Sequence, residues 1–221
     1  MKRKLRTLNV VPAMALSLLI SCNQIKIVDM PIEFDEERKE LSIQYLKERH
    51  GIEQDHPYIK PSMVVVHWTA IPTLEGTIKA FEKSTLPESR APLLGASRLN
   101  VSAHFVVDRD GTIYRMLPDT VIARHCIGLN YCAIGIENIG DGKDFPLTDA
   151  QLASNIALVK DLHKKHPIEY LIGHHEYQRF RNHELWKETD PDYLTFKIDP
   201  GDEFMRKMRS ALHKLDLKGA P

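Results

Sequence analysis

The chain of 221 residues carries 30 basic and 30 acidic side chains, so its formal net charge at neutral pH is zero. This length is ample for one domain with a substantial hydrophobic core. The balanced charge offers no basic stripe for a phosphate backbone, and we therefore expect no nucleic-acid partner.

The N-terminus has the pattern of a bacterial export signal. Four basic side chains lie within residues 2–6, and residues 10–20 form an apolar run too short to span a membrane. Residues 19–22 resemble the lipobox of lipoproteins, which predicts a signal peptide over residues 1–21 and a lipid anchor on Cys22. An uncleaved amphipathic start is the alternative. Asn23 replaces the aspartate of inner-membrane retention, so we expect attachment to the outer membrane, facing the periplasm.

The predicted mature chain begins with a tether and a helix. We interpret residues 22–60 as this N-terminal part, with residues 25–30 as a short tether. Residues 35–49 have apolar side chains on one side and dense charge on the other, which predicts an amphipathic helix. Residues 61–217 are then expected to form the main domain. Removing residues 1–21 leaves 26 basic against 30 acidic residues, a net charge near −4.

A buried strand carries the first candidate site residue. Residues 64–66 are three consecutive valines, which predict a strand buried on both faces. His67 follows at the end of this strand. A rigid position facing a loop-lined surface suits a metal ligand or a catalytic base, although a histidine that merely ends the strand is the simpler alternative.

A helix and a hairpin come next. Thr73 can cap a helix that continues to Phe81, and the loop over residues 87–100 can form a groove wall. Residues 104–108 and 112–117 read as two strands joined by an Asp-Gly turn, which predicts a β-hairpin.

A carboxylate interrupts the next buried strand. Residues 133–140 alternate isoleucines with small residues and contain Glu137. Because an ionised carboxylate is costly to desolvate, Glu137 should either pair with a cation or take part in chemistry. In the loop before it, Cys126 and Cys132 leave two possibilities open, a small disulfide or two buried thiols.

The C-terminal half continues the alternation of helices and strands. Thr148 and Gln151 form the sequence pattern of a capping box, and a helix is expected up to Pro167. Residues 168–172 predict a strand that leads to His174, and residues 204–215 a C-terminal helix. The whole pattern indicates a single α/β domain with a mixed sheet flanked by helices.

Three candidate ligands emerge from separate segments: His67, His174 and Asp199. Two imidazoles and one carboxylate are the protein ligands of a catalytic zinc site that keeps a position for water. Spacing alone does not distinguish them from structural histidines whose hydrogen bonds are satisfied within the fold.

Five motifs, in this order, resemble the type-2 N-acetylmuramoyl-L-alanine amidases. The motifs are Val-Val-His-Trp-Thr-Ala (65–70), Val-Ser-Ala-His-Phe (101–105) with Asp-Gly (110–111), Ile-Gly-Ile-Glu (134–137), Gly-His-His-Glu (173–176) and Lys-Ile-Asp-Pro-Gly (197–201). The resemblance spans about residues 60–215 and is nearest in pattern to the bacterial anhydromuramoyl amidases and their outer-membrane lipoprotein relative. Phage relatives have a tyrosine where this chain has Ala103, which fits the bacterial branch that uses a glutamate.

The resemblance implies a zinc hydrolase that cleaves the amide between N-acetylmuramic acid, intact or anhydro, and L-alanine of the stem peptide. It assigns zinc to the three candidate ligands, proton transfer to Glu137 and oxyanion stabilisation to Lys197. His125 and Asn130 become candidate substrate contacts. His175 would support the strand or the ligands without binding the metal. Six further histidines lie in polar contexts where we expect exposed side chains, and they receive no role: His50, His56, His163, His166, His183 and His213. A monomer is expected.

Two other functions compete with this one. Some recognition proteins keep the fold but lack zinc ligands, so a non-catalytic peptidoglycan-binding module is the main alternative. A glycosidase is weaker, because it needs two carboxylates flanking one bond.

A second aspartate competes for the third ligand position. Asp190 follows a lysine, as Asp199 does, but Asp199 has Lys197 two residues before it and Pro200-Gly201 directly after it, which completes the motif. We therefore choose Asp199. Residues 177–196 are then expected to be an insertion that packs on the domain or walls the groove.

Overall fold

The computed structural model describes residues 25–90, 93 and 95–221. The predicted signal peptide and Cys22 lie outside these residues. Within them, no helix combines the length and apolar character needed to cross a membrane.

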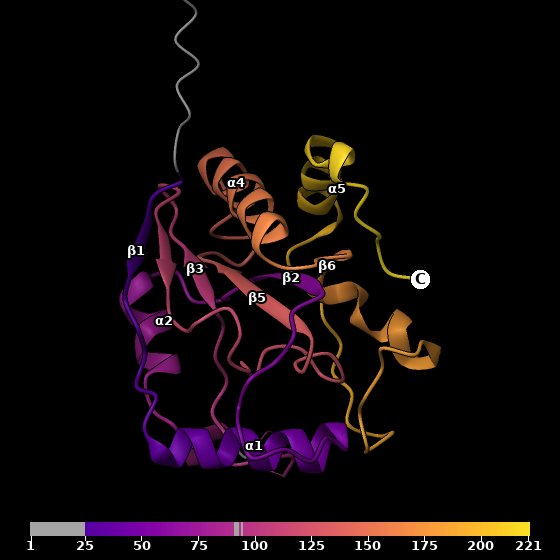
Figure 1. Cartoon of the computed structure of the whole chain (residues 1–221). Helices are drawn as coiled ribbons and strands as arrows, with labels where there is room; N and C mark the ends of the chain where they lie inside the picture. The colour runs from indigo at the N-terminus through magenta and orange to yellow at the C-terminus, as the bar shows by residue number, and fades with distance from the viewer. Residues whose placement is uncertain (1–24, 91–92, 94) are drawn as a thin grey trace, which may run out of the picture.

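A six-stranded mixed sheet forms the centre of the protein (Figure 1), as the sequence predicts. The strands lie in the order β1-β4-β3-β5-β2-β6, and every neighbouring pair is parallel except β3 and β4, which form the predicted hairpin. Their bounds are β1 Ile27–Asp29, β2 Met63–Trp68, β3 Phe105–Val107, β4 Ile113–Arg115, β5 Ala133–Asn138 and β6 Tyr170–Gly173.

Helices cover both faces of the sheet. Figure 1 shows α4 and α5 on one side and α1 on the other. The α-helices with described bounds are α1 Glu36–His50, α2 Leu74–Phe81, α4 Asp149–Lys165 and α5 Asp202–Ala211. 3-10 helices span Glu88–Arg90, His174–Asn182 and His213–Leu215. Thr73 and Thr148 cap α2 and α4 through their side chains, as predicted, and Gln151 completes the capping box.

Successive side chains of β2 point to opposite faces of the sheet. Val64 and Val66 pack against α4 and α5, whereas Val65 faces the opposite cluster, which contains Tyr177 and Phe180. His67 shares the side of Val65 because side chains two apart point to the same face of a strand. The sheet therefore turns His67 away from α4 and α5.

The interpretation of residues 25–30 as a tether is wrong. Ile27–Asp29 forms the edge strand β1 and pairs in parallel with Ile113–Arg115 of β4. Backbone hydrogen bonds continue the pairing from Met30 to Arg115 and from Ile32 to Met116. A three-residue strand is too short for its period-two pattern to stand out in the sequence, and its partner lies far along the chain.

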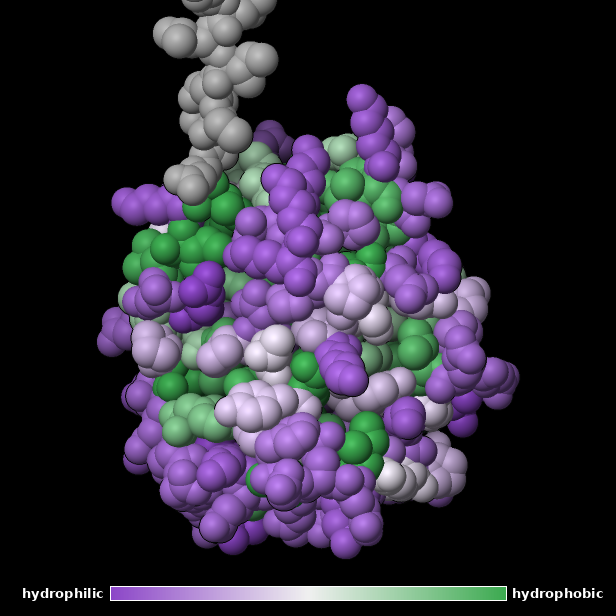
Figure 2. All heavy atoms as spheres, viewed as in Figure 1, coloured by the Kyte–Doolittle hydropathy of each residue, from purple (hydrophilic) through white to green (hydrophobic). Residues whose placement is uncertain are grey.

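The segment of residues 177–196 packs as an integral part of the domain. Phe180 is fully buried beneath the sheet, and Trp186 stacks on Tyr177 with ring centroids 6.1 Å apart. At the end of α1, Arg49 forms an ion pair of 2.6 Å with Glu188, whose side chain is fully buried. The N-terminal helix and this segment thus hold each other in place. On the face in Figure 2, hydrophilic side chains cover most of the surface and apolar areas are small and separate.

His50 is buried, not exposed as its polar context suggested. Its Nδ1 atom lies 2.6 Å from the Lys187 carbonyl oxygen, which only accepts, so Nδ1–H is the donor. Burial lowers the pKa of His50 to about 4. The unfolded chain binds this proton near pH 6.5, so the stability that neutral His50 contributes is complete above that pH and is lost as pH falls towards 4.

We expect His50→Asn to weaken the pH dependence of stability. Asparagine can keep the donor to Lys187 but does not titrate, so the slope of unfolding free energy against pH should fall by up to about 1.4 kcal/mol per pH unit within that window. Urea unfolding of both proteins across this pH range measures the slope. Equal slopes would show that His50 does not carry this dependence.

Candidate metal centre

Three buried side chains converge at one edge of the sheet. His67 is the penultimate residue of β2, His174 directly follows β6, and Asp199 lies in the loop before α5. Their exposed fractions are 1%, 6% and 7%. One potential ligand atom from each lies within 4.8 Å of the other two. The Asp199 Oδ2 atom is 2.9 Å from His174 Nδ1 and 3.3 Å from His67 Nδ1.

Strand register and a short backbone contact bring the three together. β2 and β6 are parallel, and Val66 pairs with Gly173, so the residues that follow them, His67 and His174, become neighbours. The Asp199 carbonyl accepts hydrogen bonds from the backbone N–H of His175 and from its ring, each at 2.9 Å. His175 therefore supports the loop that carries Asp199 and contributes no ligand atom to the group.

The charges of the group suit a cation. Burial lowers the pKa of His174 to about 3 and keeps its imidazole neutral. Burial alone would raise the pKa of Asp199, but the neighbouring imidazoles of His174 and His67 outweigh burial and hold that pKa below its usual range. A neutral imidazole and an ionised carboxylate are the protonation states in which these groups bind metal.

Glu137 lies beside this group on the next strand. It pairs with His67 in the register of β5 and β2, so both side chains point to the same face of the sheet. Its Oε2 atom is buried and has no hydrogen-bond partner among the described residues. Burial, followed by the negative charge of Asp199, raises the pKa of Glu137 well above its usual value, and the Lys197 ammonium opposes this shift.

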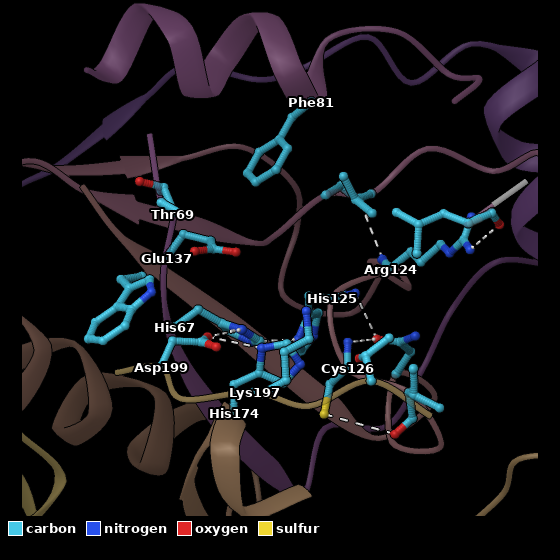
Figure 3. A pocket seen from close by; sticks show the side chains of 18 of the residues that line it. His67, Thr69, Phe81, Arg124, His125, Cys126, Glu137, His174, Lys197 and Asp199 are labelled. Carbon is cyan, nitrogen blue, oxygen red and sulfur yellow. Dashed lines mark hydrogen bonds and ion pairs between the residues drawn. The ribbon is translucent and has the colours of Figure 1, made fainter. Parts of the chain in front are cut away.

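A cavity of about 270 Å³ opens over these side chains. Figure 3 shows Glu137 pointing into it beside His67, with Asp199 and Lys197 at its base. Tyr45 of α1 and Tyr193 of the 177–196 segment also line it, so the two segments just described supply part of the wall. The position of Tyr193 agrees with the expectation that its segment packs on the domain or walls the groove. Sequence reasoning placed Tyr45 only on the apolar side of its helix, because no local pattern marks it as part of a cavity.

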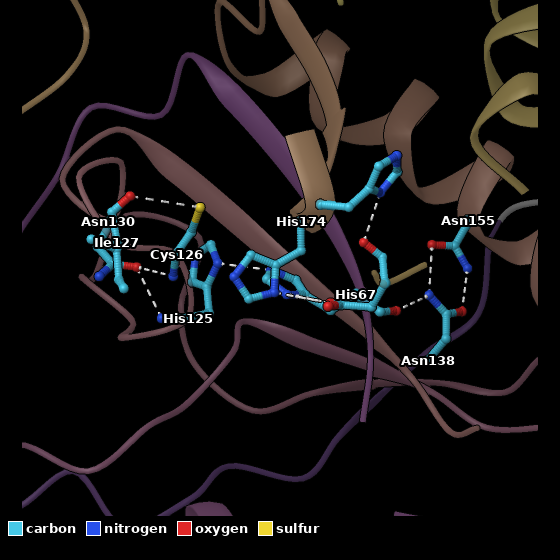
Figure 4. A network of polar contacts seen from close by, with 10 residues as sticks. His67, His125, Cys126, Ile127, Asn130, Asn138, Asn155 and His174 are labelled. Atoms are coloured by element: carbon cyan, nitrogen blue, oxygen red, sulfur yellow. Dashed lines mark hydrogen bonds and ion pairs between the residues drawn. The ribbon is translucent and has the colours of Figure 1, made fainter. Parts of the chain in front are cut away.

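The two predicted substrate contacts have other partners. The Asn130 side-chain oxygen accepts from the backbone N–H groups of His125 and Cys126 at 2.9 and 2.7 Å, and its amide donates to Tyr45 Oη at 3.2 Å. Asn130 therefore shapes the loop; it also lines the cavity, and its contact with substrate stays a prediction. The His125 Nδ1 atom lies 3.0 Å from Nε2 of His67 (Figure 4). In the described part of the chain, Cys126 and Cys132 are buried free thiols.

Asp190 stands apart from the two histidines. Its carboxylate lies 3.7 Å from the Arg49 guanidinium at the end of α1. Among the described residues, the aspartate that joins His67 and His174 is Asp199.

Near the carboxyl ends of neighbouring strands, a buried His-His-Asp group lies beside a carboxylate oxygen that has no hydrogen-bond partner among the described residues. This arrangement defines a candidate metallohydrolase site. A family model described as N-acetylmuramoyl-L-alanine amidase matches residues 57–202. The chain belongs to the N-acetylmuramoyl-L-alanine amidase family, which confirms the resemblance noted in the sequence.

Solved structures share the fold. N-acetylmuramoyl-L-alanine amidase LysC from Clostridium intestinale is 22% identical, with a TM-score of 0.53 over 87% of this chain and 99% of that chain. A selenomethionine derivative of AmpD is also 22% identical, with a TM-score of 0.55 over 85% of this chain and 95% of that one. A comparison with curated protein sequences gave no match.

Proposed function

We propose that this protein is a zinc-dependent hydrolase of the amide between N-acetylmuramic acid and the L-alanine of peptidoglycan stem peptides. Family membership supports the substrate class. The observation that carries the proposal of catalysis is the position of Glu137 on the same sheet face as the His-His-Asp group. One oxygen of its carboxylate is buried and has no hydrogen-bond partner in the part of the chain that the structure describes. Desolvating a carboxylate costs free energy, and binding peptidoglycan without cleaving it does not require a carboxylate in this position.

The chemistry of the donor set fits zinc. Two imidazole nitrogens and one carboxylate oxygen converge from three rigid positions, and three protein ligands leave a fourth position for water. We assign His67, His174 and Asp199 as the ligands. A bound Zn²⁺ supplies an acidified water, with a pKa of roughly 7 instead of about 15.7 in bulk solvent.

Proton transfer is assigned to Glu137 and charge stabilisation to Lys197. The Glu137 Oε2 atom can take a proton from the attacking water, and its raised pKa favours holding that proton until the amine leaves. The half-buried Lys197 lines the same cavity, where its ammonium can stabilise the oxyanion that develops on the scissile carbonyl. Burial of the cavity floor strengthens both effects, because fewer waters compete.

Metal removal tests the proposal. After dialysis against a chelator, the protein should release no stem peptide from muropeptides, and added Zn²⁺ should restore release, as followed by mass spectrometry. Running intact and anhydro muropeptides in parallel defines which sugar form belongs to the substrate class. If chelation did not affect the release of stem peptide, hydrolysis would not depend on zinc. Muropeptides that stay intact under every condition would identify a non-catalytic binding module.

A further inference from the structure

We propose that His125 is a positioning residue for the metal centre. It accepts a hydrogen bond from His67 Nε2–H and so directs the His67 Nδ1 lone pair towards Asp199. This inference deepens the proposed function and rests on its assignment of His67 as a ligand. It replaces the substrate contact predicted for His125 from the sequence.

The direction of each hydrogen bond follows from one carbonyl group. The His125 Nε2 atom lies 3.3 Å from the Ala133 carbonyl oxygen, and a carbonyl only accepts, so Nε2 carries the hydrogen. The neutral His125 ring then has a lone pair on Nδ1, which lies 3.0 Å from His67 Nε2. That pairing requires a hydrogen on His67 Nε2 and leaves the lone pair on His67 Nδ1, the atom that faces Asp199 at 3.3 Å.

The loop and the sheet hold the His125 ring in this orientation. Its backbone N–H donates to Asn130, and the rings of His125 and His67 meet edge to face at 89°. The ring also lies directly over Gly135 of β5, where an added Cβ would come within 2.8 Å of it. A glycine at this position is what allows the ring to approach the strand, so the fold is shaped around the histidine pair.

The hydrogen bonds of His125 set this role apart from substrate binding. His125 is partly exposed and lines the cavity, but both ring nitrogens already have protein partners. Substrate would therefore meet only ring carbons unless a hydrogen bond were broken. Partners that orient a ligating imidazole typically contribute about 10–100-fold to metal affinity.

Zinc affinity of two His125 variants tests the proposal. His125→Leu removes the acceptor, whereas His125→Asn can place an amide oxygen near the position of Nδ1. In competition with a chromophoric chelator, His125→Leu should bind Zn²⁺ about 10–100-fold more weakly than the unchanged protein, and His125→Asn should stay within a few-fold. At saturating zinc, the KM of both variants for muropeptide should stay near that of the unchanged protein.

The outcomes separate this inference from the proposed function. If the unchanged protein binds no zinc, both fail. If it binds zinc and His125→Leu binds equally well, only the role of His125 fails, and a raised KM would then return His125 to substrate contact. Nitrogen NMR of the unchanged protein gives a test that needs no variant: His125 should carry its proton on Nε2, and a proton on Nδ1 would overturn the proposal.

Discussion

Replacing Glu137 by glutamine should lower the rate of muropeptide hydrolysis by about 100-fold to 10,000-fold while zinc stays bound. The amide matches the carboxylate in shape but cannot accept the proton of the attacking water. The Glu137 Oε2 atom has no hydrogen-bond partner among the described residues, so the substitution leaves the surrounding hydrogen bonds intact. Glu137 is also absent from the group of converging ligand atoms.

Rate and metal content, measured on the same sample, check this expectation. Glu169→Gln is a matched control, because Glu169 is exposed and pairs with Lys218 at 2.9 Å outside the cavity. The control should retain full activity. If Glu137→Gln lost zinc together with activity, Glu137 would be a ligand and not the proton-transfer group.

Replacing Asp199 by alanine should remove most of the zinc. The Asp199 Oδ2 atom contacts Nδ1 of both His67 and His174, so the substitution removes the one charged donor of the group. Two neutral imidazoles remain, which is fewer than the three protein ligands that a catalytic zinc site uses.

Asp190→Ala is the matched control for this second prediction. Asp190 lies beside Arg49 and its side chain is 48% exposed, so its loss should leave zinc content unchanged. Elemental analysis of the two purified variants measures the metal directly. Zinc lost from Asp190→Ala and kept by Asp199→Ala would move the third ligand to Asp190 and make Lys187 the candidate for oxyanion stabilisation.

Short-range patterns predicted much of the fold. The three valines of β2 and the isoleucines around Glu137 marked central strands, because a strand buried on both faces has a nearly continuous apolar sequence. Thr148 and Gln151 located the start of α4, since the two hydrogen bonds of a capping box need only residues three apart. These signals arise within a few residues, where a sequence can be interpreted without a fold.

Contacts between distant segments account for what sequence reasoning missed. The strand β1 has only three residues and gains its partner 86 positions later, where Asp29 pairs with Arg115. His50 is buried because Lys187 and its neighbours fold over the end of α1. The periodicity of apolar residues along the sequence does not predict contacts between such distant segments.

Hydrolysis of muropeptides in water enriched in heavy oxygen tests the central claim most directly. Attack of water on the lactyl carbonyl places one oxygen from solvent in the new carboxylate of the sugar and releases an unlabelled peptide that begins with L-alanine. We expect mass spectrometry of the zinc-loaded protein's products to show this distribution. Label in a peptide carboxylate, with the sugar still joined to L-alanine, would show that a different bond is cleaved and would contradict the account.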